Sequence, residues 1–69
     1  MNKEVVTANG KELEVEVPCS LTQFLRSLNH YPRSVVVEHN GEAVAPSEFD
    51  DRQVQAGDRL EIVKIVAGG

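Results

Sequence analysis

The chain ends in two glycines, and the carboxylate of its last residue is the group most clearly capable of a reaction. The final residues are Ala67, Gly68 and Gly69. Glycine has no Cβ, so an extended Gly-Gly segment can pass through a channel that any side chain would block. The carboxylate of Gly69 would then be unhindered and suited to in-line attack on a phosphorus centre. Taken alone, however, such an end is more typical of a frayed terminus.

The strand predicted over residues 59–66, just before these glycines, changes character along its length. Side chains at alternate positions of a strand point to opposite faces. The set on one face is apolar and suits a core, whereas the set on the other face begins with charged residues and becomes apolar at Val63 and Ile65. Branched apolar side chains on the solvent-exposed face of a strand indicate a surface that another protein covers. We therefore predict that Val63, Ile65 and Val66 bind a partner and that Ala67 and Gly68 thread Gly69 into it. The alternative is that the chain's own loops cover these side chains.

The other residues capable of chemistry stand apart from one another. Cys19 precedes a predicted helix and is either a reactive thiol or, more simply, a small packed residue. His30 and His39 have no companion ligand at metal-binding spacing, so a surface role is predicted for both. Asp50 and Asp51 form a carboxylate pair in a turn. We expect no catalytic residue and no metal site, and we predict that the chain is not an enzyme.

Length and charge narrow the class of protein. With 69 residues the chain suffices for one small domain, predicted over residues 1–66 and followed by a flexible Gly-Gly tail over 67–69. The net charge of −4 argues against nucleic acid and anionic membranes as targets. Neither an apolar run of membrane-spanning length nor a signal-peptide pattern is present, so a cytoplasmic protein is expected. Alternating glutamates form an acidic face that serves solubility or steers a basic partner: Glu12, Glu14 and Glu16.

Two Asn-Gly pairs predict hairpin turns that join neighbouring strands. Asn9-Gly10 follows a strand over residues 3–8, and the strand after it alternates up to Pro18 with apolar residues inward: Leu13, Val15 and Val17. Asn40-Gly41 follows the apolar run 35–37, which has the pattern of a strand buried within a sheet. The strand after this second turn extends through Val44.

One helix is predicted between these hairpins. Ser20 and Gln23 have the spacing of a capping box, and an apolar stripe follows at helical spacing: Leu21, Phe24, Leu25 and Leu28. Asn29 ends the helix after about three turns. Ser47 is expected to cap a single helical turn, and residues 59–66 to form the last and longest strand. This order predicts an α+β fold in which the helix covers one face of a mixed sheet of four to five strands.

Three segments resemble a known family in combination. Residues 37–42, 56–63 and 66–69 are similar to the ThiS-type sulfur carriers of thiamine biosynthesis, within the wider MoaD/ThiS group. The resemblance covers essentially the whole chain and implies that group's ubiquitin-like β-grasp fold. One departure is Glu38-His39, where the family more often has small apolar residues.

The resemblance implies a cycle in which the chain is a co-substrate. A ThiF-like or E1-like enzyme, using its own ATP and Mg²⁺, would adenylate the Gly69 carboxylate. A sulfur-donor protein would convert the acyl-adenylate to a thiocarboxylate, which a thiazole synthase (ThiG) would consume. No cofactor is expected on this chain itself.

Three alternatives remain open at this point. The small sulfur-carrying subunit of molybdopterin synthase has the same implied fold and tail. A ubiquitin-like protein modifier would instead join its terminal glycine to lysines. A plain interaction module would use neither chemistry.

Overall fold

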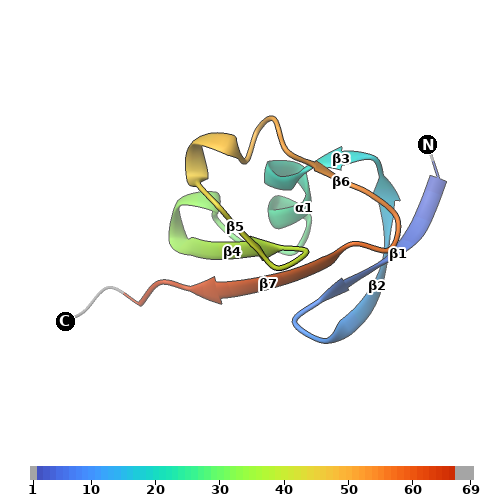
Figure 1. The fold of residues 1–69 in the computed structure, drawn as a ribbon, viewed down its shortest axis with the longest axis horizontal. Helices are drawn as coiled ribbons and strands as arrows, with labels where there is room; N and C mark the ends of the chain where they lie inside the picture. Colours follow the sequence, from blue (N-terminus) through green and yellow to red (C-terminus); the bar gives the residue numbers. More distant parts are fainter. Residues whose placement is uncertain (1, 67–69) are drawn as a thin grey trace.

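The computed structural model describes residues 2–66, and its main feature is a five-stranded mixed sheet with a helix on one face (Figure 1). The strand order across the sheet is β2-β1-β7-β4-β5, and β3 and β6 form a separate pair. The elements are β1 (Asn2–Ala8), β2 (Lys11–Val17), β3 (Cys19–Ser20), α1 (Leu21–Ser27), η1 (Pro32–Ser34), β4 (Val35–His39), β5 (Glu42–Val44), η2 (Pro46–Glu48), β6 (Gln53–Val54) and β7 (Arg59–Lys64). This arrangement confirms the predicted α+β class.

The two Asn-Gly turns form the hairpins that the sequence predicts. Asn9 and Asn40 have φ angles of 50° and 52°, and the glycines after them lie at 81° and 83°. Two consecutive positive φ angles give the turn that matches the twist of antiparallel strands. The two hairpins set the register of β1 with β2 and of β4 with β5.

The helix begins as predicted. The Gln23 N–H donates to the Ser20 hydroxyl at 3.0 Å, and the Ser20 N–H donates to the Gln23 side chain at 2.9 Å, which completes the capping box. Leu21, Phe24 and Leu25 are buried against the sheet, while Leu28 is only half-buried at the helix end. Asn29 follows with a positive φ of 63°. We call the covered side of the sheet the helix face and the opposite side the outer face.

Burial alternates along the strands because α1 covers only one face. Val6, Val37, Leu60 and Ile62 are among the buried core residues on the helix face. Leu13 and Val15 on β2 are half-buried, and the alternating Glu12, Glu14 and Glu16 are exposed, as the pattern predicts.

Several predictions about individual elements are wrong. Val36 is 53% exposed, because its parity within β4 places it on the outer face rather than in a buried run. Strand β7 ends at Lys64 instead of Val66, so β1 and β2, with seven residues each, are longer. Ser47 does not cap η2; Pro46 takes the first helical position, which makes Ala45 the N-cap without a side-chain bond. The short β3–β6 pair was not predicted.

Within residues 2–66, no helix combines the length and the apolar character that crossing a bilayer requires.

Candidate functional site

The predicted site divides at Val66. The predicted reactive and threading residues, Gly69, Gly68 and Ala67, lie outside the described residues. The predicted binding residues Val63 and Ile65 are described together with Val66, and their exposed fractions are 62%, 55% and 84%. The alternative that local loops cover them is therefore wrong.

Strand β7 leads to this end of the chain and is held between two neighbours. It pairs in parallel with β1 and antiparallel with β4. The Ile65 N–H donates to the Ser34 carbonyl at 2.8 Å, which extends the β4 side one residue beyond the strand. The backbone is therefore fixed up to Ile65, next to the predicted tail.

A group of exposed apolar residues lies at the same end of β7. Val63 stands directly opposite Val36 on the outer face, and both are more than half exposed. With Ile65 and Val66 they form what we call the apolar patch, consisting of Val36, Val63, Ile65 and Val66. Three of its members were predicted from the sequence; Val36 was not, although the alternation of side chains along β4 places it on the outer face.

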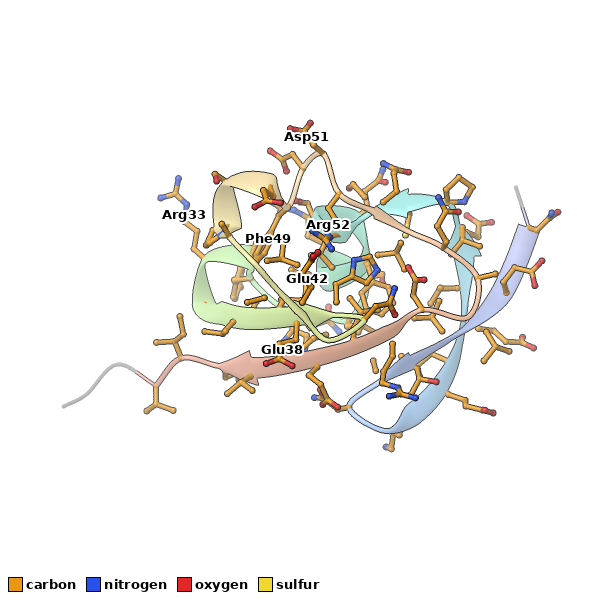
Figure 2. All side chains as sticks on the ribbon, in the orientation of Figure 1. Arg33, Glu38, Glu42, Phe49, Asp51 and Arg52 are labelled. Atoms are coloured by element: carbon orange, nitrogen blue, oxygen red, sulfur yellow. The ribbon has the colours of Figure 1, made fainter. Side chains whose placement is uncertain are left out.

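Two carboxylates border the apolar patch. Glu38 of β4 stands opposite Glu61 of β7 on the outer face, one pair further along the sheet. Figure 2 shows Glu38 on the opposite side of the sheet from Phe49 and Arg52. Like charges in direct cross-strand register are destabilising. A partner that covers the apolar patch and places a cation here would relieve this repulsion.

The opposite end of β7 is built around a buried histidine. His39 is 5% exposed, so its predicted surface role is wrong: its parity matches that of Val35 and Val37 and turns it to the helix face. Its Nδ1 accepts a hydrogen bond from Arg52 Nε at 2.9 Å, and its Nε2 lies 2.6 Å from Asp58 Oδ2. A ring nitrogen that accepts from arginine carries no proton, so Nε2 carries it and donates to Asp58.

Arg52 extends this cluster outward. Its guanidinium pairs with Glu42 and lies 3.6 Å from Glu48, so that one side chain links β5 and η2 to β4 (Figure 2). The hydrogen bond to Arg52 lowers the pKa of Glu42. We call His39, Arg52, Glu42 and Asp58 the histidine cluster.

Asp58 joins the histidine cluster to the turn that precedes β7. Burial opposes ionisation of its carboxyl, but the Gln55 N–H and the His39 and Asn40 side chains outweigh it, so its pKa lies below the usual range. The backbone of Gly57, at φ 81°, donates to the Val5 carbonyl at 2.8 Å in the same turn. These bonds fix where β7 begins.

The asparagines of the two hairpin turns also bind β7, a role that sequence analysis missed. The Asn9 side chain accepts from the Ile62 N–H at 2.7 Å and donates to the Ile62 carbonyl at 3.0 Å. It thus takes the place of a strand residue where β1 has ended. On the other edge, Asn40 Oδ1 accepts from the Arg59 N–H at 2.8 Å. Asparagine is favoured in such turns for its backbone alone, so the sequence carried no separate signal.

The remaining candidates form no site of their own. Cys19 packs half-buried against the core, and burial raises the pKa of its thiol, which agrees with the simpler interpretation of a packing residue. Asp50 accepts a hydrogen bond from Thr22 at 2.6 Å. No group of three potential metal ligands occurs in the described part of the chain.

The comparisons with known proteins agree with this geometry. The family model described as "ThiS family" matches residues 1–69. The crystal structure of a thiamine biosynthesis protein (ThiS) from Geobacter metallireducens superposes with a TM-score of 0.80 and 32% identity, covering 94% of this chain and 99% of that one. A solution structure of a thiamine biosynthesis protein from that organism gives 0.77, also at 32% identity, over 94% of this chain and 87% of that one.

Two further similarities concern the fold and a longer protein. A designed protein based on human erythrocytic ubiquitin is 21% identical, with a TM-score of 0.56 over 100% of this chain and 98% of that one, which shows the fold alone and confirms the ubiquitin-like β-grasp. A thiazole synthase from Paramagnetospirillum magneticum is 36% identical over 61 residues, which are 88% of this chain. The match spans 19% of that protein, so this chain corresponds to about a fifth of its length.

Proposed function

This chain belongs to the ThiS family, and from that membership we propose that it carries sulfur as a thiocarboxylate on Gly69 for thiamine biosynthesis. The observation that carries the proposal is the end of β7. Its backbone is held up to Ile65, and the exposed apolar patch lies at the end of the described residues, next in sequence to Ala67, Gly68 and Gly69. This arrangement suits a carrier that docks by a rigid strand and presents a reactive end to its partners.

The proposed chemistry takes place in two steps. A Gly69 carboxylate oxygen attacks the α-phosphorus of ATP, forming a new P–O bond while the bond to pyrophosphate breaks. Hydrosulfide, or an equivalent from a sulfur-donor protein, then attacks the acyl carbon, and AMP leaves with the C–O bond electrons. The mixed anhydride is needed because a carboxylate, which carries a full negative charge, is a poor electrophile. In this proposal the nucleotide and Mg²⁺ are bound by a ThiF-like adenylating enzyme, and this chain is a carrier rather than a catalyst.

A thiazole synthase is the recipient that the similarities favour. Part of a thiazole synthase from Paramagnetospirillum magneticum is similar to this chain, which links the carrier domain to that activity within one protein. The resemblance to thiamine biosynthesis proteins favours this destination over molybdopterin synthase. Neighbouring genes for thiazole synthesis, rather than for the molybdenum cofactor, would strengthen this assignment.

Intact-mass measurement tests the carrier proposal. The chain is incubated with a ThiF-like enzyme, MgATP and a sulfur donor, and the expected product has one oxygen replaced by sulfur at Gly69. The same mixture without ATP is the control. An unchanged mass with an enzyme that is active on another carrier would contradict the proposal, whereas a Gly-Gly remnant on lysines of other proteins would indicate a modifier.

A variant that lacks Gly69 separates the reactive group from the fold. Gly69 lies beyond the strand that ends at Lys64, so its deletion should abolish thiocarboxylate formation and leave the melting temperature unchanged. Unfolding of the shortened chain would show that the C-terminal residues contribute to the core.

A further inference from the structure

Strand β2 lies at the edge of the sheet, and no strand among the described residues pairs with its outer side. The strand has seven residues, which is long enough to accept another strand along its length. This edge is separated from the apolar patch, since β1 lies between β2 and β7. It is therefore a second surface, and its role does not depend on sulfur transfer.

The register of the hairpin shows which backbone groups are free. The two-residue Asn9-Gly10 turn makes Ala8 and Lys11 a hydrogen-bonded pair, and such pairs alternate along an antiparallel ladder. The inward residues of β2 therefore bond to β1. The N–H and C=O groups directed away from β1 belong to Glu12, Glu14 and Glu16.

A groove runs along this edge on the helix face. It has a volume of about 740 Å³ between β2 and α1, which is within the range of sites that bind ligands. Its apolar walls come from half-buried or buried side chains: Leu13, Val15, Phe24 and Leu28. Its lining also includes polar side chains: Lys3, Glu14, Glu16 and Gln23. A strand added to β2 would place every second side chain over this groove.

The outer face of the same edge is acidic. Glu12, Glu14 and Glu16 are exposed at alternate positions, and Lys3, opposite Glu16, is the one cation in cross-strand register with them. A second copy of β2 would bring glutamates against glutamates, which disfavours self-pairing. A strand with lysine or arginine at alternate positions would place its cations beside these carboxylates.

We infer that β2 accepts an extended peptide segment of another protein in which apolar residues alternate with basic ones. The peptide backbone pairs with the free groups of the three glutamates, its apolar side chains fill the groove beside α1, and its basic side chains lie next to the carboxylates. Backbone pairing supplies the affinity and the alternation supplies the specificity.

The test is a nuclear magnetic resonance titration of the ¹⁵N,¹³C-labelled chain with a capped seven-residue peptide that alternates valine and lysine. We expect the largest shifts in the amides of residues 12–16 and in the side chains of Leu13 and Leu28. Binding should also slow alkylation of Cys19, which lines the groove. An absence of shifts, or shifts centred on the apolar patch, would overturn the inference.

Two altered peptides separate strand pairing from charge attraction. A peptide that is N-methylated at the residues facing β2 keeps its charge but loses its donors, so it should not bind. A peptide that alternates valine and glutamate should not bind either. Equal binding by one of these peptides would overturn the inference.

A charge-reversed chain supplies the matched control. The double substitution Glu12→Lys and Glu14→Lys should weaken binding of the lysine peptide on the order of tenfold, and the glutamate peptide should now bind. Both positions are exposed and stand opposite the uncharged Thr7 and Val5, so the melting temperature should hold, which separates lost binding from lost folding. Unchanged affinity for the lysine peptide would contradict the proposed role of the carboxylates.

Discussion

The two ends of β7 are built in opposite ways. At its start, Asp58 and His39 form a largely buried polar cluster, and the Asn40 side chain accepts from the Arg59 N–H. Further along the strand, the Asn9 side chain binds the backbone of Ile62. At its end, Val63 and Ile65 are exposed and are followed by residues of a proposed reactive tail. A strand that is fixed at one end and exposed at the other can present its end without loss of register.

Each end has the composition that its task requires. Polar groups with fixed partners specify one geometry. Once they are hydrogen-bonded to each other, few of their donors and acceptors remain free to bind a second protein. Exposed apolar side chains contribute little to the free energy of folding and are available for binding. We therefore expect substitutions at the start of β7 to change stability, and substitutions at its end to change binding.

The largest expected effect distinguishes Ile62, which lies within β7, from Ile65, which directly follows the strand. Ile65→Glu should weaken binding to the proposed ThiF-like adenylating enzyme by about tenfold to a hundredfold, because burying such a side chain contributes ~1.5–3 kcal/mol. Stability should hardly change, since Ile65 is 55% exposed. Ile62→Ala is the matched control: Ile62 is 6% exposed, so its truncation should cost about 2–4 kcal/mol of unfolding free energy. Calorimetric titration and urea unfolding measure the two quantities, and a large loss of stability for Ile65→Glu would place that residue in the core.

The second prediction concerns His39. His39→Leu removes the ring between Asp58 and Arg52, and we expect a loss of about 1–3 kcal/mol in the free energy of unfolding because the partly buried Asp58 carboxylate loses one of its donors. Binding of the adenylating enzyme to the folded variant should stay within twofold. Urea unfolding and calorimetric titration again test both statements, and weakened binding at full stability would contradict the division between the two ends.

A smaller effect should appear in the dependence of stability on pH. The pKa of Asp58 is lowered in the folded chain, so its contribution is present above the unfolded value of ~3.9 and is lost as pH falls through the folded value. Asp58→Asn should therefore lower stability at neutral pH and flatten the loss below about pH 4. The unsubstituted chain, unfolded in urea over the same pH range, is the reference. An unchanged profile in Asp58→Asn would show that other carboxyl groups govern acid unfolding.

The sequence predicted the parts of the molecule that depend on neighbouring residues. The capping box at Ser20, the Asn-Gly turns and the alternation in β2 each follow from local chemistry, and all are present. The exposure of Val63 and Ile65 followed in the same way from their parity. That they bind a partner stays a prediction.

The parts that were missed depend on contacts between distant segments. The bonds of Asn9 to Ile62 join residues 53 positions apart, and no local pattern indicates them. The burial of His39 required knowing that β4 pairs with β7 beneath α1, although the parity of Val35 and Val37 already pointed inward. Strand β7 was predicted too long because its composition stays apolar beyond the last residue that pairs with β4.

The smallest predicted effect tests whether a charge pair on the outer face lowers the stability of the fold and strengthens the binding of a partner. Glu38 stands opposite Glu61 beside the apolar patch, so Glu38→Lys replaces a repulsion with an attraction and should stabilise the fold by ~0.5 kcal/mol. If the adenylating enzyme places a cation here, the same substitution should weaken its binding several-fold, most clearly at low salt. The control is Glu12→Lys, since Glu12 lies on the same face of the sheet but on the distant strand β2. If Glu38→Lys raises stability and weakens binding, the repulsion in the free chain favours formation of the complex. If it raises both, the partner's cation lies elsewhere.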